Sequence, residues 1–312
     1  MSAIGENEIA LAPAETMPVL PPRRLWRQLL RHNGVMAGAI VLAIVILIGL
    51  TAPLLGTVDP SAIDPSVRNK TPGTEITMRL DDGSKVTRTL LMGSDSLGRD
   101  IYSRVLYGAR VSLIVGVAVS VIAIVIGLFI GMIAGYVRWL DGIVMRVMDG
   151  LMAIPAILLA IALVSVWGAG LGTVIFAIVV PEVPRVVRLV RAVVLSIREE
   201  PYVEAAIASG TRTPQILLFH VLPNTIAPLI VQATYICASA ILIEAILSFL
   251  GIGIPSDIPT WGNIMAEGRQ FFRLYPHNIF FPGIFLALTV LAVNIMGDGL
   301  RDTLDPRMAK RF

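Results

Sequence analysis

The sequence has little charge, a single cysteine and only three lysines. Charged residues make up 15% of its 312 positions, whereas roughly a quarter is usual in soluble domains. The lone Cys237 excludes a disulfide within the chain and any metal site made of several cysteines. Lys70, Lys85 and Lys310 do not lie in a Gly-Lys-Ser/Thr sequence, so the chain has no Walker A loop. If ATP drives this protein, another chain must bind it.

Long uncharged runs place the chain in a membrane. Hydrophobic residues make up 55% of the sequence and the mean hydropathy is +0.79. No residue between Asn33 and Val58 is charged, and a membrane span needs roughly 20 apolar residues. We therefore predict a first span over 33–56. It is too long, and lies too far from the N-terminus, for a cleaved signal peptide.

The residues before this span predict its orientation. Residues 1–22 are rich in Glu, Pro and Ala without periodicity, which is typical of a disordered tail. Four arginines follow, at positions 23, 24, 27 and 31. Because positive charge marks the cytoplasmic side of a span, we expect the tail and its basic flank, residues 1–32, to be cytoplasmic.

Residues 57–110 then form a polar segment outside the membrane. Ile76, Met78 and Leu80 alternate with polar residues, Asp82-Gly83 suits a turn, and the alternation resumes, which predicts a β-hairpin. The hairpin either contacts an external partner or is a loop without one. Apolar residues at helical spacing over 97–108 predict an amphipathic helix lying on the outer surface.

Five further spans follow within a predicted core of residues 111–305, before a cytoplasmic tail at 306–312. Val111–Val137 is uncharged, and Gly127, Gly131 and Gly135 in it favour close helix packing. Arg138, Asp141 and Arg146 suit a short inside loop. The remaining predicted spans are two over 150–181, joined by a tight glycine-rich turn at 168–172, then 221–243 and 279–296. Aromatic residues between the last two, at positions 261, 271, 272 and 275, suit a membrane interface. The fold class is therefore all-α, with six spans and both ends cytoplasmic.

Other site chemistries lack the residues that they need. The pI near 9.2 comes from arginines beside the predicted spans, so it gives no indication of nucleic-acid binding. His32, His220 and His277 are far apart and on different predicted sides, which argues against a shared metal site. No Gly-x-Ser-x-Gly or His-Glu-x-x-His pattern supports a hydrolase. We expect no metal, no cofactor and no catalysis in this chain.

A short polar segment, residues 200–223, lies between the fourth and fifth predicted spans. Pro201 suits a first helical position, and Glu204 in the first turn complements the helix dipole. Gly210 can end the helix in a left-handed cap. Thr213-Pro214 predicts the start of a second helix, and Pro223 its end. This helix-glycine-helix segment, residues 200–223, is called the elbow, and its form suits docking into a cleft on another protein.

These residues resemble a known loop. Glu204-Ala205-Ala206, then Gly210, then Leu222-Pro223 resemble the EAA loop of bacterial ABC-transporter membrane subunits, although His220 stands where many such loops carry Ile. Two further stretches, 98–110 and 297–306, resemble dipeptide/oligopeptide permeases, specifically the C-type membrane subunit.

The resemblance implies a fold, partners and a mechanism. It implies the type I ABC importer permease fold, in the bacterial inner membrane and surrounded by lipid. The partners would be a second homologous permease, two ATPase subunits and a periplasmic binding protein. Glu204, Ala205, Ala206, Ile207, Gly210, Leu222 and Pro223 would form the coupling helix that fits into an ATPase. ATP hydrolysis there would drive alternating access for small peptides.

Four polar residues in or near the spans are candidates for the translocation pathway. Glu182 and Arg185 share one helical face, either as an internal ion pair or as a substrate-pathway site. Glu244 lies roughly 27 Å along a helix from Ile226, at 1.5 Å per residue, which predicts the outer interface. It could line an external gate or bind a substrate amine. Asn294 is either an interhelical hydrogen-bond partner or a ligand.

Alternative functions remain open from the sequence. An importer of the same family could carry a nickel chelate, glutathione or a small glycoside, because much of the specificity lies in the binding protein. An ATP-independent carrier or channel would need no docking elbow and would favour internal symmetry or an ion site. A membrane receptor or structural anchor would leave the elbow unexplained as well.

Overall fold

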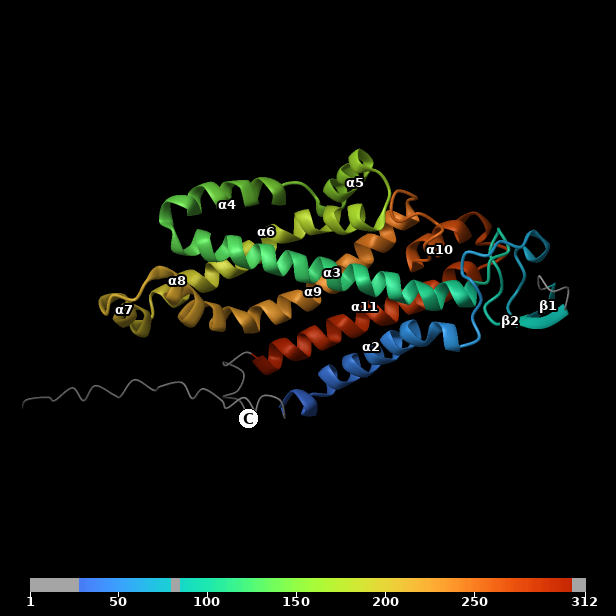
Figure 1. Ribbon diagram of the computed structural model, residues 1–312, viewed down its shortest axis with the longest axis horizontal. Helices are drawn as coiled ribbons and strands as arrows, with labels where there is room; N and C mark the ends of the chain where they lie inside the picture. The colour runs from blue at the N-terminus through green and yellow to red at the C-terminus, as the bar shows by residue number, and fades with distance from the viewer. Residues whose placement is uncertain (1–27, 80–84, 305–312) are drawn as a thin grey trace, which may run out of the picture.

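A computed structural model describes residues 28–79 and 85–304. Long helices run side by side along the longest axis, with the β-hairpin at one end and helix α7 at the other (Figure 1). The predicted tails at 1–27 and 305–312 and the predicted hairpin turn at 80–84 lie outside the described residues. We refer to the two ends as the hairpin end and the elbow end.

Helices dominate the described residues. The elements are α2 (Asn33–Thr51), the 3-10 turns η1 (Ala52–Leu54) and η2 (Pro65–Val67), strands β1 (Thr74–Arg79) and β2 (Lys85–Leu90), α3 (Ile101–Tyr136), α4 (Arg138–Met152), α5 (Ala156–Trp167), α6 (Leu171–Arg198), α7 (Pro201–Ala208), α8 (Thr213–Ile216), the π-helical turn η3 (Leu217–Val221), α9 (Leu222–Phe249), α10 (Trp261–Gly268), the 3-10 turn η4 (Arg269–Phe271) and α11 (His277–Leu304).

Four of the described helices are long and apolar enough to cross a membrane. They are Asn33–Leu54, Ile101–Tyr136, Thr213–Phe249 and His277–Leu304, and the bent pair α4 and α5 would make a fifth. Helix α6 has sufficient length, with 28 residues, but it carries Glu182, Arg185 and Arg188. The chain is therefore a multi-pass helical protein with four to five apolar spans.

Glycines allow α3 and α6 to pack closely at the centre of the bundle. Gly127, Gly131 and Gly135 face valines of α6, and a Cβ added at Gly131 would lie 2.7 Å from the Cβ of Val190. Real Cβ atoms do not approach so closely, so only glycine fits there. The predicted close packing along this stripe is confirmed.

The start of α3 differs from the prediction. We expected a surface helix over 97–108 that is separate from the span, but α3 begins at Ile101 and continues through the span to Tyr136. Asp100 caps it by accepting from the backbone N–H of Ser103 at 3.1 Å. Trp261, expected at a membrane interface, is instead fully buried and donates its Nε1–H to the Val105 carbonyl at 3.1 Å. Helix α10 packs on the first turns of α3, and most of the residues over 101–109 are buried.

The segment between α3 and α6 also differs in part. Residues predicted as a short loop at 138–146 form α4, whose Asp141 pairs with Arg191 of α6. Helix α4 meets α5 at a bend of 87°, just before Pro155, which disfavours a helical residue ahead of it. The predicted tight turn is confirmed between α5 and α6, where Gly168 has φ +86°.

The predicted hairpin is confirmed. Strands β1 and β2 pair antiparallel with Ile76 opposite Arg88. Ile76 is buried in a small cluster with Val67 and Leu90. The Arg88 guanidinium joins the hairpin to the bundle by donating to the Gly56 carbonyl at 2.8 Å and to Asp100 Oδ2 at 3.1 Å.

Candidate functional site

The elbow, residues 200–223, forms the tip of the molecule opposite the hairpin (Figure 1). Helix α7 begins at Pro201, and Glu204 lies in its first turn, as predicted. Val203 is fully buried and anchors α7 to the bundle, whereas Ala205 is exposed and Ala206 is partly exposed. The Glu-Ala-Ala sequence is therefore presented largely outward.

A glycine cap ends α7. Gly210 has φ +79°, the left-handed conformation that L-residues adopt at a cost. Its N–H donates to the Ile207 carbonyl at 2.9 Å, and the N–H of Thr211 donates to the Ala206 carbonyl at 3.1 Å. This pair of bonds is a Schellman motif. The predicted left-handed cap is confirmed, and it sets the direction in which the chain leaves α7.

The second half of the elbow differs from its prediction. We expected a helix that starts near Thr213 and stops at Pro223. Helix α8 does start at Thr213, but one helical run continues to Phe249 through the π-helical turn η3. The N–H of Leu222 donates to the Leu217 carbonyl there. Pro223 directly follows this π-helical turn, so it lies where the α-helical register of the run is already interrupted.

Exposed apolar side chains cover the elbow. Ile207 is 47% exposed and Phe219 is 72% exposed, and Tyr202 and Leu218 are also exposed. Exposed charged residues, Glu200, Glu204 and Arg212, lie among them. An apolar patch with a polar rim is typical of a protein interaction site.

A contact that the sequence analysis missed ties α7 to α9. The Tyr202 ring stacks on the His220 ring, with centroids 6.1 Å apart and planes inclined by 19°. Asn224 Nδ2 donates to the His220 carbonyl at 2.7 Å and to the Tyr202 hydroxyl at 3.4 Å. Partial burial, with the nearby Glu200 charge, raises the pKa of Tyr202, so its hydroxyl stays protonated. His220 was noted only as a departure from a pattern, and nothing in the sequence paired it with Tyr202.

The candidate pathway residues lie at separate places. Glu182 is fully buried in α6, 3.1 Å from Arg185 Nη1, and it also accepts from the Ser239 hydroxyl of α9 at 3.2 Å. This i,i+3 ion pair matches the predicted face. Glu244, expected at an interface, is also fully buried and accepts from the Ser248 hydroxyl at 2.8 Å. Asn294 is half-buried in α11.

A second polar cluster, also missed from the sequence, lies at the hairpin end. The Arg99 guanidinium donates to Asp95 at 2.7 Å and to Glu267 of α10, and Arg104 lies 3.4 Å from the same Glu267. Burial raises the pKa of Glu267, although both arginines oppose this shift. These ion pairs join α10 to the start of α3. Within the described residues, no group of three or more His, Cys, Asp or Glu side chains could hold a metal.

The apolar helices and the helical bundle define a multi-pass membrane protein. The fold resembles a solved chain of the inward-facing MetNI methionine ABC transporter, with a TM-score of 0.52 and 20% identity, over 65% of this chain and 96% of that chain. This likeness concerns the fold alone.

Sequence comparisons identify the family. Residues 123–310 match the model of the binding-protein-dependent transport system inner membrane component, and residues 21–72 match the N-terminal transmembrane domain of oligopeptide transport permease C. A probable peptide ABC transporter permease of Sinorhizobium fredii is 53% identical over 90% of this chain and 91% of its own length. A dipeptide transport system permease of Alkalihalophilus pseudofirmus is 41% identical over 93% of this chain and 91% of its own. The chain therefore belongs to the family of binding-protein-dependent transport system inner membrane components.

Proposed function

We propose that this chain is one permease subunit of an ATP-driven importer of small peptides. The exposed elbow carries the proposal, because an ordered, capped Glu-Ala-Ala helix with apolar side chains facing outward between charged residues suits a docking partner. The similarity to permeases named for peptides and dipeptides supports the cargo class. The chain itself would hydrolyse no ATP, since its sequence has no Walker A loop.

The proposed membrane arrangement has six spans with both ends in the cytoplasm. The four apolar helices and the bent α4–α5 pair supply five, and α6 supplies the sixth, with Glu182 and Arg185 neutralising each other inside it. The proposed divisions are a tail and flank at 1–32, a first span at 33–56, an external segment at 57–110, a core at 111–305 that contains the elbow, and a tail at 306–312.

Labelling with a membrane-impermeant maleimide tests this arrangement. Cys237 would be replaced by serine, and single cysteines would be placed at Thr89 in the hairpin or at Ser209 in the elbow, both of which are exposed. In intact spheroplasts the Thr89→Cys variant should label, and the Ser209→Cys variant should label only after lysis. The reverse pattern would overturn the orientation.

In the proposed mechanism, closure of two ATPase subunits moves the elbow and rocks the spans between outward-open and inward-open states. Ile207 and its exposed neighbours fill a cleft on one ATPase, and Gly210 holds α7 at the angle that this cleft requires. Because α8, η3 and α9 form one helical run, displacement of the elbow acts directly on a span. A second, related permease and a periplasmic binding protein complete the complex.

Glu182, Arg185, Glu244 and Asn294 are proposed as pathway residues. Arg185 has the best access among the charged ones, since half of its side chain is exposed while Glu182 is buried. An importer of glutathione, a nickel chelate or a small glycoside would use the same elbow, so the cargo must be identified through the binding protein.

The first test is a mild-detergent pull-down of the full chain from its native membrane, with mass spectrometry. We expect a second six-span permease, ATPase subunits and a binding protein whose ligand can be screened against peptides. A chain that runs alone or as a self-oligomer would overturn the coupling role and favour a carrier or channel. Recovery of the complex with a binding protein that ignores peptides would overturn the cargo alone.

A further inference from the structure

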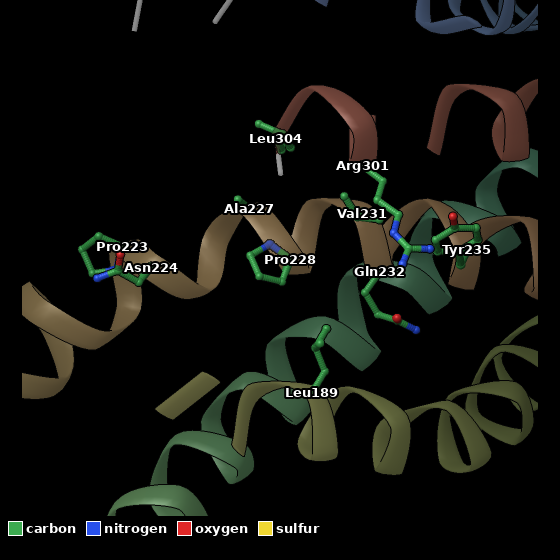
Figure 2. Close-up of a pocket in the computed structure, with 10 residues that line it drawn as sticks. All are labelled: Leu189, Pro223, Asn224, Ala227, Pro228, Val231, Gln232, Tyr235, Arg301 and Leu304. Carbon is green, nitrogen blue, oxygen red and sulfur yellow. The ribbon is translucent and has the colours of Figure 1, made fainter. Parts of the chain in front are cut away.

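A cavity of about 630 Å³ opens between α6, α9 and α11 toward the elbow end (Figure 2). Small-molecule sites usually have volumes of about 300–1,000 Å³ and apolar walls with a few polar groups. Here the apolar wall comes from residues of all three helices: Leu189, Ala227, Pro228, Val231 and Leu304. The cavity therefore has the size and lining of a ligand site.

Three of the polar residues that line the cavity, Gln232, Tyr235 and Arg301, lie far from its elbow end (Figure 2). Tyr235 donates its hydroxyl hydrogen to Asp298 Oδ1 at 2.6 Å. The guanidinium of Arg301 extends from α11 toward Tyr235, whereas the Gln232 side chain extends from α9 away from that guanidinium (Figure 2). The lining therefore offers the Arg301 cation for a carboxylate and the Gln232 amide for a peptide bond. Arginine binds carboxylates through two parallel hydrogen bonds, which fixes the orientation of the ligand.

The other end of the cavity reaches the elbow. Asn224 lines it, and the same side chain donates to the Tyr202 hydroxyl of α7 and to the His220 carbonyl. A molecule that contacts Asn224 therefore contacts the residue that ties α9 to α7. If this contact differs between elbow positions, occupancy of the cavity and the position of the elbow are coupled.

We propose that this cavity binds a short peptide at the elbow end of the spans, with the peptide carboxylate on Arg301, and that the bound peptide acts on the elbow through Asn224. The inference rests on the proposed peptide cargo. The peptide either comes from the cytoplasm or is cargo in passage, and both would present the same carboxylate, amine and amide groups. Uncharged sugars and metal ions would lack the partner for Arg301.

Direct binding tests the site. The whole transporter, purified in nanodiscs without its binding protein, would be titrated calorimetrically with tri-alanine and with tri-alanine amide. The acid should bind, and the amide, which lacks the carboxylate, should bind at least tenfold more weakly. Arg301→Gln should weaken acid binding at least tenfold, whereas Arg273→Gln, an exposed arginine near the hairpin end, should leave it unchanged. Equal binding of acid and amide, full binding by Arg301→Gln, or no binding would each overturn the proposal.

The ATPase rate tests separately whether a bound peptide acts on the elbow. Tri-alanine added to nanodiscs should change the ATPase rate that the loaded binding protein stimulates. Tyr202→Phe removes the hydroxyl to which Asn224 donates and lies outside the cavity lining, so it should keep binding but lose this change. If peptide alters the rate only when the binding protein delivers it, the occupant is cargo in passage; if free peptide suffices, it enters from the cytoplasm. A transporter that imports peptides but shows no site in this titration would refute this inference and leave the proposed function intact.

Discussion

Replacing Gly210 by valine should uncouple the elbow from its partner without removing the protein from the membrane. Gly210 has φ +79°, and a Cβ built there meets nothing within 4 Å, so the cost is conformational and not steric. The left-handed conformation costs an L-residue about 1–2 kcal/mol, and a β-branched residue is less tolerant still. If valine instead leaves the left-handed region, the cap loses its two hydrogen bonds, at about 0.5–1.5 kcal/mol each. Either outcome costs the cap about 1–3 kcal/mol, which is enough to displace it, but α6 and α9 keep their own packing.

The assay is ATPase activity of the reconstituted transporter, stimulated by its loaded binding protein. Gly210→Val should lose most of the stimulation at normal membrane levels. Gly210→Asn should keep most of it, because asparagine tolerates the left-handed conformation. Gly56→Val is the matched control, since Gly56 has φ +70° and equally open surroundings at the hairpin end. Full stimulation of Gly210→Val, or equal loss in Gly56→Val, would refute the role of the cap.

Two further predictions concern packing and charge. Gly131→Ala should lower the stability of the bundle by about 1–3 kcal/mol, as over-packing usually does. Gly150→Ala should not, because the space around Gly150 is open. Thermal unfolding in detergent, followed by fluorescence, would show this difference, and equal melting temperatures of the two variants would contradict it. Arg99→Met should lower the stability by about 3–5 kcal/mol, because it leaves the buried Asp95 carboxylate without its closest partner. Asp149→Asn breaks an ion pair whose side chains are half exposed, so it should cost about 1 kcal/mol or less. Similar melting temperatures for the two variants would argue against a stabilising cluster at the hairpin end.

The apolar runs predicted most of the bundle because a long uncharged segment has few alternatives to crossing a membrane. The stretch over 97–108 was misplaced since its helical spacing fits a surface helix equally well. Only tertiary contacts distinguish the two possibilities. Arg104 is fully buried and donates to Asn263 of α10, a helix more than 150 positions later in the chain. No local sequence pattern indicates a contact with so distant a helix.

In the elbow, too, the local features could be predicted from the sequence and the tertiary contacts could not. The cap at Gly210 could be predicted because a left-handed glycine after a short helix is a local event. The Tyr202–His220 stack could not, since it needs the chain to return on itself. Pro223 misled the sequence analysis because the rule that proline ends a helix assumes α-helical register, whereas this proline follows a π-helical turn.

That π-helical turn provides a last prediction. Leu217–Val221 inserts a wider turn between α8 and α9, so it sets the rotation of α7 about the span. Deleting Phe219, which is 72% exposed, should restore α-helical register at little cost in packing. Each residue of an α-helix turns about 100°, so the elbow would be forced to rotate by a similar angle.

Such a rotation is incompatible with the present contacts, because Val203 is fully buried against the bundle. The deletion variant should therefore insert and bind lipid normally, yet lose ATPase stimulation by the loaded binding protein. Phe219→Leu keeps the register and a large apolar side chain, so it should retain most of the stimulation. If the deletion couples as well as Phe219→Leu, the register does not position the elbow, and exposed apolar contacts alone would have to account for docking.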